Sequence, residues 1–172
     1  VKSSQSDSSG TLLESQIQPL PLKRGSLELT KTVNSLEVLE NQAVFSLSNI
    51  PDRPGIAAQI FEKLSEACVN VDLIIQATND GNNNDITFTV SELEVKKTAE
   101  QCELITSQLG GEYNLKTNMT KLSIQGAGIM GRPSVSADLF DTLSQANINV
   151  RLIATSEIKV SCVIEINNIP KA

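Results

Sequence analysis

The sequence predicts an α+β protein of two similar units, each an antiparallel sheet with helices on one face. An amphipathic helix at 56–67 stands between segments whose apolar residues alternate or run continuously, as strands require. The same pattern returns 79 positions later without a gap, which indicates an internal duplication. The chain of 172 residues has room for two small domains. The matched pairs include Pro54 and Pro133, Phe61 and Phe140, Leu64 and Leu143, Ala67 and Ala146, Asn70 and Asn149, and Val71 and Val150.

The elements of the first unit follow from the spacing of its apolar residues. Alternation predicts a strand at 43–48, after a turn at 40–42 and an earlier short strand at 33–39. The other predicted elements are the helix at 56–67, strands at 71–77 and 86–90 joined by a polar turn, a helix at 95–109 that Gly110 and Gly111 end, and a strand near 113–116.

The second unit repeats this path, with a first strand around Leu122 and Ile124, a helix at 135–146 and strands at 150–155 and 160–166. The order strand, helix, strand, strand, helix, strand is the ferredoxin-like βαββαβ arrangement. Residues 167–172 give only the start of the expected last helix, so we expect either that the sequence is a fragment or that the second unit is completed by another segment, for which the strand at 33–39 is the best candidate. The predicted division is a Ser- and Pro-rich linker or tail at 1–32, a first domain at 43–116, and a second domain formed by 33–39 with 117–172.

The loop before the first helix carries the candidate chemistry. Pro54 suits the first turn of a helix, and Gly55 lets the backbone approach a bound group closely. Amides at a helix start lack partners within the helix and favour an anion, while Asp52 can hold an ammonium group. Together they suit an amino-acid zwitterion. In the structural alternative, Asp52 only caps the helix and the Pro-Gly pair only turns the chain.

Composition removes several classes of function. The net charge of −6 and the absence of a basic stripe argue against nucleic-acid binding. Histidine is absent, so the commonest general base and metal ligand is missing, and no metal site or catalytic constellation is visible. The three cysteines are far apart and are typical of reduced thiols in a cytoplasmic protein. No apolar run reaches the ~20 residues that span a bilayer, and we expect no membrane partner.

Three segments closely resemble the paired ACT domains in the regulatory part of aspartate kinases. They are NIPDRPGIAAQIFEKLSEACVNVDLIIQ, DITFTV and GAGIMGRPSVSADLFDTLSQANINVRLIATSEIKVSCVI. The resemblance covers about residues 33–170, and DITFTV and TSEIK tie it to aspartate kinase. It implies a regulatory module that binds lysine and/or threonine and mediates allosteric feedback inhibition in the aspartate pathway. In that family the first ACT domain is inserted within the second, in agreement with a strand at 33–39 that completes the second unit.

The resemblance also implies what this chain lacks and needs. A Lys-Phe-Gly-Gly-type segment, the signature of the kinase domain, is missing here, so we expect no catalytic activity from this chain alone. ATP and Mg would bind the absent kinase domain, and the chain itself needs no cofactor. The implied partners are the catalytic domain or subunit of aspartate kinase and a second copy of the chain, in a homodimer through the ACT domains.

The family's site residues carry over by position. The effector loop falls on Asp52, Pro54, Gly55, Ile56 and Ala57, with Gln76 reaching the ligand from the next strand. The segment Asp85, Ile86 and Thr87 matches positions that sense or transmit binding. Ser134 stands where the family usually has glycine, so a second effector site is as open as a structural role for that loop. In the second unit, the positions that match the facing domain interface are Met130, Arg132, Val150, Thr155, Ser156 and Glu157.

Three other functions remain as alternatives. A free-standing ACT-domain sensor would bind an amino acid and regulate a separate partner rather than a kinase subunit. A ferredoxin-like nucleic-acid binder needs basic residues and exposed aromatic rings, which this acidic sequence lacks. Acid or base catalysis through Glu157 or Asp85 is the least favoured, because the kinase motifs and histidine are missing.

Overall fold

The computed structural model describes residues 33–79, 82–127, 129, 132 and 134–165. The predicted tail at 1–32, the interface candidate Met130 and the incomplete last helix lie outside these residues. The elements are β1 (Ser35–Pro51), α1 (Ile56–Glu66), β2 (Ile74–Asn79), β3 (Asn83–Ser91), the short 3-10 helix η1 (Glu92–Glu94), α2 (Val95–Leu109), β4 (Glu112–Gln125), α3 (Ser134–Gln145), β5 (Leu152–Thr155) and β6 (Lys159–Glu165).

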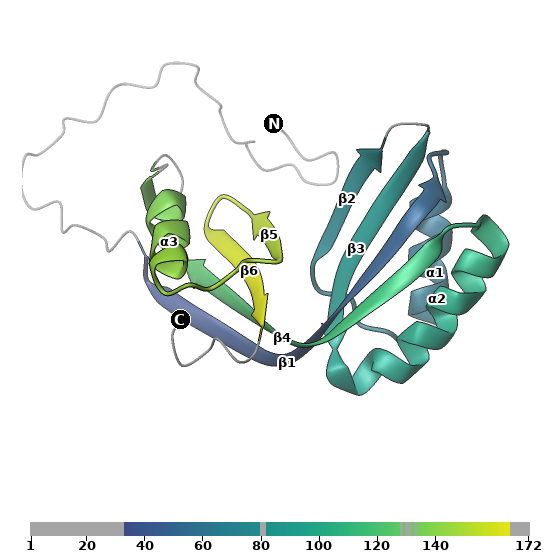
Figure 1. Cartoon of the computed structure of the whole chain (residues 1–172), viewed down its shortest axis with the longest axis horizontal. Coiled ribbons are helices and arrows are strands. Elements are labelled where there is room, and N and C mark those ends of the chain that lie inside the picture. Colours follow the sequence, from purple (N-terminus) through teal and green to yellow (C-terminus); the bar gives the residue numbers. More distant parts are fainter. Residues whose placement is uncertain (1–32, 80–81, 128, 130–131, 133, 166–172) are drawn as a thin grey trace, which may run out of the picture.

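One antiparallel sheet holds the described strands in the order β2-β3-β1-β4-β6-β5. The first unit consists of β2, β3, α1, α2 and the adjoining halves of β1 and β4. The second unit consists of α3, β5, β6 and the other halves of β1 and β4. The two long strands therefore run through both units and join them (Figure 1). Within the first unit the strand order and the two helices give the predicted ferredoxin-like arrangement.

The predicted turn at 40–42 is wrong, because β1 continues through it. Asn41 takes a φ of 55° and the pairing with β4 shifts register beside it, between Leu39 and Gln42. Asn118 takes a φ of 58° in β4, so the strands predicted near 113–116 and 122–124 are also one strand. Asparagine tolerates the left-handed region better than most residues, and the extra residue bends the strand without reversing it.

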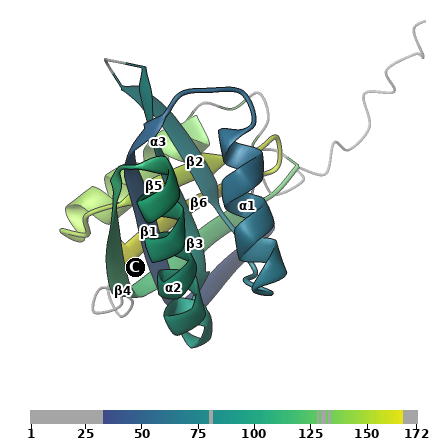
Figure 2. The same cartoon turned by 90° about the vertical axis from the view of Figure 1, so that its right-hand side faces the viewer.

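A single cluster of buried apolar residues holds the first unit together. Ile56, Ile60 and Leu64 of α1 face the sheet, as their spacing predicts. They pack with Phe45 and Phe88, whose rings stack with centroids 5.7 Å apart. Each such side chain stabilises the fold by roughly 1.5–3 kcal/mol when fully buried. Figure 2 shows α1 and α2 in front of this part of the sheet.

The first half of β1 pairs with the second unit. Leu36 lies opposite Ile124 and Val38 opposite Leu122, on the far side of β4 from β6. Helix α3 buries Leu143 against Leu122 on the same face. This pairing supports the proposal that 33–39 belongs to the second domain.

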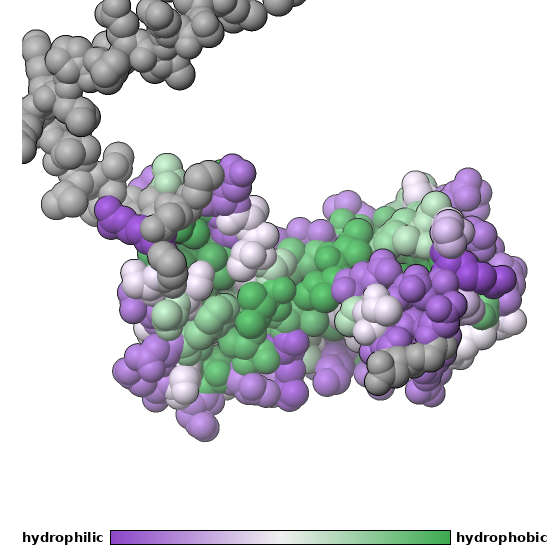
Figure 3. Space-filling model, turned by 90° about the horizontal axis from the view of Figure 1, so that it is seen from above, coloured by the Kyte–Doolittle hydropathy of each residue, from purple (hydrophilic) through white to green (hydrophobic). Residues whose placement is uncertain are grey.

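The helices lie on the outer sides of the two units, and the uncovered sheet faces turn toward each other (Figure 1). Val44, Met119 and Val163 are buried between these faces, with Leu73 and Leu152 packed against them. Figure 3 looks onto this side and shows a band of hydrophobic residues running from one unit to the other. None of the described helices is both long and apolar enough to cross a membrane.

Candidate functional site

The loop between β1 and α1 is built by its contact with the β2–β3 turn and by Gly55. The backbone amide of Asp52 donates to the carbonyl oxygen of Asn82 at 2.8 Å. Gly55 takes a φ of 91°, a left-handed conformation that glycine adopts without strain. The chain then enters α1 with no side-chain cap on the helix. The alternative in which Asp52 caps the helix is therefore wrong.

The carboxylate of Asp52 is instead held by a buried asparagine. Asn84 Nδ2 donates to Asp52 Oδ1 at 2.8 Å, and Asn84 is 4% exposed. Its other amide atom, Oδ1, is buried with no hydrogen-bond partner among the described residues. Such an atom costs roughly 1–3 kcal/mol, so the fold tolerates a penalty at the residue that orients the carboxylate. Asn84 was not predicted as a site residue, because it is the last of three successive asparagines that are typical of a polar turn. The sequence offered one signal: Asn84 lies two residues before Ile86, on the same face of the strand, and is polar where the apolar alternation would continue.

Free backbone amides lie at the start of α1, close to this carboxylate in the chain. The amide of Ile56 bonds the carbonyl of Arg53 at 3.2 Å. The amides of Ala57 and Ala58 donate no backbone hydrogen bond to any described residue. These donors carry the partial positive charge of the helix start. Asp52 and the α1 amides thus present a carboxylate and hydrogen-bond donors of partial positive charge on one exposed loop.

The remaining candidates of the first unit divide between the two faces of the sheet. Gln76 pairs with Ile86 on the helix side of the edge strand β2 and is exposed, so it can reach a ligand near α1. Ile86 itself is 1% exposed and packs in the core. Asp85 Oδ1 accepts the amide of Asn49 at 3.0 Å, and Thr87 donates to the Ser46 hydroxyl at 3.1 Å. The structure thus gives the predicted Asp85–Thr87 segment packing and sheet contacts rather than a place beside the α1 amides.

The second-unit candidates are also split. Val150 lies where the two units meet, in a cleft of about 350 Å³ that also contains Thr87. Thr155, Ser156 and Glu157 lie at the β5–β6 turn, where the Ser156 amide donates to the Lys159 carbonyl at 2.7 Å. That turn is at the end of β5 away from Val150.

Arg132 and Ser134 line an apolar groove elsewhere in the second unit. The groove has a volume of about 470 Å³ and lies between α3, Ile124 of β4 and Val33, which precedes β1. Ser134 is the first residue of α3 and is exposed.

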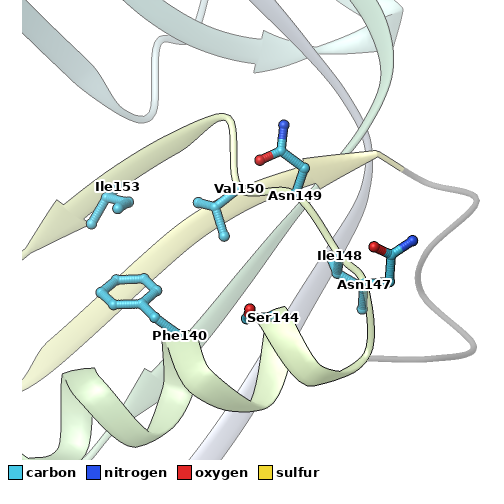
Figure 4. A pocket seen from close by; sticks show the side chains of 7 residues that line it. All are labelled: Phe140, Ser144, Asn147, Ile148, Asn149, Val150 and Ile153. Carbon is cyan, nitrogen blue, oxygen red and sulfur yellow. The ribbon is translucent and has the colours of Figure 1, made fainter.

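One pocket of the second unit was not predicted. It measures about 420 Å³ and lies between the last turns of α3 and the edge strand β5 (Figure 4). Phe140, Ser144 and Val150 point into it, whereas the side-chain amides of Asn147 and Asn149 point away from α3 (Figure 4). The signal available in the sequence was the match of Asn149 with Asn70 in the duplication.

Two of the three cysteines, Cys102 and Cys162, are unreactive at neutral pH. Burial raises the pKa of Cys102 to about 12 and that of Cys162 to about 11, so both stay protonated. Cys68 is exposed. No group of three or more metal-ligating side chains occurs within the part of the chain that the structure describes.

Comparison with known proteins agrees with this architecture. An ACT-domain family model matches residues 48–103 and 122–172, one match in each unit. The aspartokinase of Thermus thermophilus is 34% identical over 166 residues, which cover 95% of this chain and 39% of that protein. The chain thus spans about two fifths of the length of this relative.

Solved structures give the same picture. The ligand-free regulatory subunit of aspartate kinase from Thermus thermophilus is 33% identical, with a TM-score of 0.74 over 80% of this chain and 91% of that subunit. The aspartate kinase from Synechocystis is 37% identical, with a TM-score of 0.80 over 84% of this chain and 26% of that chain.

The fold and these comparisons define a regulatory module. The chain belongs to the ACT-domain family. More narrowly, it is a tandem ACT module similar to the regulatory region of aspartokinases, as its segments predict.

Proposed function

We propose that this chain binds lysine and/or threonine at the loop before α1 and transmits feedback inhibition to an aspartate kinase. The observation that carries the proposal is the Asp52 carboxylate, fixed by Asn84, on the loop that leads into unpartnered amides of α1. An α-amino acid carries an ammonium and a carboxylate on one carbon. A short loop with an anion and free amides matches that pair of charges.

Each group of the ligand has a proposed partner. The ammonium group binds Asp52, and the carboxylate binds the amides of Gly55 and Ala57. The amide of Ile56 can join them by releasing the Arg53 carbonyl oxygen, to which it donates at 3.2 Å. Hydrogen bonds to charged groups contribute roughly 1.5–3 kcal/mol each. Gln76 contacts the ligand's polar groups from β2. Lysine and threonine share the zwitterion, so the choice between them depends on the side-chain pocket.

Inhibition requires that the ligand bind one arrangement of the protein better than another. The effect on a catalytic partner equals this difference in affinity, typically ~1–3 kcal/mol. We propose the catalytic domain or subunit of aspartate kinase as that partner, in the cytoplasm. A homodimer through the edge strands is also proposed, since β2 and β5 leave backbone groups unpaired and expose Ile74 and Ile153.

Calorimetric titration with threonine and lysine, singly and together, tests the site. Asp52→Ala should weaken binding at least tenfold, because the ammonium group loses its counter-charge. Glu62→Ala is the matched control, since Glu62 is an exposed carboxylate on α1, the helix that follows the Asp52 loop, and binding should be unchanged. Equal affinities in wild type and Asp52→Ala would reject the proposed site.

A free-standing amino-acid sensor remains the second candidate. It is favoured by the match to a separate regulatory subunit over 91% of that subunit's length. Gel filtration of the chain with an aspartate kinase catalytic domain, with and without effector, separates the two. Co-elution supports the kinase module, and independent elution supports the sensor.

A further inference from the structure

The duplication gives the two units equivalent loops with opposite charges. The shift of 79 positions places Asp72, between α1 and β2, on Arg151, between α3 and β5. The residues that follow them, Leu73 and Leu152, pack in the same cluster between the uncovered sheet faces. Each loop therefore meets the other unit on the same side of the molecule, one with a carboxylate and the other with a guanidinium group.

The loop between α1 and β2 contacts the second unit through an ion pair. Asp72 pairs with Lys121 of β4, in the second unit. The Lys121 side chain is only 5% exposed, and Val163 is its partner in β6. Opposite charges and burial leave no cleft for a ligand between these two groups.

The loop between α3 and β5 carries Arg151 toward another cation. Arg151 lines the 350 Å³ cleft together with Lys116 of β4, in the first unit. Both also line an adjoining hollow of about 330 Å³. Like charges do not pair, so the cleft stays open where its counterpart is closed.

The charges of this cleft leave an excess cation. Arg151 Nη2 donates to Glu165 at 2.6 Å, which occupies one of its five N–H donors. Lys116 is exposed and forms no ion pair with the other described residues. Two cations and one carboxylate leave one positive charge, which suits a monoanion.

The rest of the lining suits a small organic molecule. Thr87 Oγ1 donates to Ser46 Oγ at 3.1 Å, so the Ser46 hydroxyl proton can donate to a ligand. The apolar walls are the side chains of Val44, Met119 and Leu152, which share one cluster between the uncovered sheet faces. Val150 also lines the cleft, while its side chain packs toward α3.

We propose that this cleft binds a small monocarboxylate between Lys116 and Arg151, and that the bound anion bridges the two units. It supplies the negative charge that Asp72 supplies on the opposite side. The site is separate from the amino-acid loop at Asp52, on the other face of the first unit's sheet, and does not depend on the proposed function.

Sodium propionate serves as the probe, because it joins one carboxylate to a short apolar chain. Amide shifts of the ¹⁵N-labelled chain are followed during titration, with sodium chloride at the same ionic strength as the reference. We expect saturable shifts at Lys116, Arg151, Val150 and Thr87, and none of these with chloride. Shifts that rise without saturation, or that chloride reproduces, overturn the proposal.

Two variants of the exposed Lys116 sharpen the test without disturbing the core. Lys116→Gln should weaken propionate binding at least tenfold, while Lys96→Gln, an exposed lysine of α2, should leave it unchanged. Lys116→Glu should pair with Arg151, close the cleft and abolish binding. An unchanged propionate affinity in Lys116→Gln, or any saturable propionate binding at the cleft in Lys116→Glu, refutes the assignment.

The Asp52→Ala variant separates this site from the amino-acid loop. Propionate shifts at the cleft should be the same in this variant as in the wild type. Their loss would place the carboxylate at α1 and overturn the cleft proposal, whatever the outcome with threonine and lysine.

Discussion

A carboxylate binds an ammonium group best when its position is fixed before the ligand arrives, and Asn84 does this for Asp52. The asparagine lies in β3 and is buried, whereas the aspartate is exposed on the loop. The buried Asn84 Oδ1 has no partner among the described residues, so this orientation comes with a cost in stability. At the residue scale, the site depends on one hydrogen bond between strand and loop.

The variant Asn84→Ala should separate binding from stability. It frees the Asp52 carboxylate, so calorimetry should show effector affinity about tenfold lower, or ~1.4 kcal/mol. The substitution removes one hydrogen bond but also the unpartnered oxygen. The free energy of unfolding in urea should therefore change by less than about 1 kcal/mol. Thr78→Ala, at the position opposite Asn84 in β2, is the control. A large loss of stability with unchanged affinity would assign Asn84 a structural role alone.

At the scale of elements, the link between α2 and β4 shows how two neighbouring glycines differ. Gly110 and Gly111 both have left-handed φ angles, of 84° and 82°. A Cβ on Gly110 would have nothing within 4 Å, whereas one on Gly111 would lie 2.3 Å from the Ser48 carbonyl oxygen. Gly111 thus lets β4 begin its pairing with the end of β1, where Ser48 lies opposite Glu112.

The pair Gly110→Ala and Gly111→Ala tests this difference. Both substitutions place alanine at a positive φ, which costs roughly 1–3 kcal/mol. Gly111→Ala adds a clash with backbone and should lose at least about 2 kcal/mol more. Urea unfolding measures both values. Equal losses would show that β1 moves aside at this point without cost.

At the scale of the whole molecule, the two units are held by the continuous strands β1 and β4 and by the ion pair of Asp72 with Lys121. Lys121 is almost fully buried, and Asp72 is 40% exposed at its side chain. Removing the aspartate leaves a buried ammonium group without a counter-charge. Removing the lysine leaves a carboxylate that water can solvate.

This asymmetry gives a prediction for the two single variants and the double variant. Asp72→Asn should lower the free energy of unfolding by about 2 kcal/mol, a value reduced for the exposure of the pair. Lys121→Met should change it by less than about 1 kcal/mol, because a similar volume stays buried. The double variant should regain most of the free energy of unfolding that Asp72→Asn loses, because no buried charge remains. Additive losses across this cycle would mean that the two charges do not interact.

Prediction succeeded where a local signal was complete. The helix expected at 95–109 is observed as Val95–Leu109, because its apolar stripe ends at Gly110. The turn expected at 40–42 failed, since Asn41 is compatible with both a turn and a bulge in a strand. Asp52 and Gly55 could be proposed from the loop sequence, but Asn84 could not, because its role depends on a contact 32 residues away.

By itself, the sequence determined the duplication, the helices and most strands. It also identified Asp52, the charged residue of the loop before α1, and Gly55, which takes a positive φ there. These features follow from spacing and residue type, which are local properties. Only the tertiary structure decided that β1 and β4 cross both units and that Asn84 orients Asp52. It also decided that Asp72 forms an ion pair with Lys121, whereas Arg151 lies with Lys116 at an open cleft. These depend on strand register and on packing between distant segments, which no local pattern specifies.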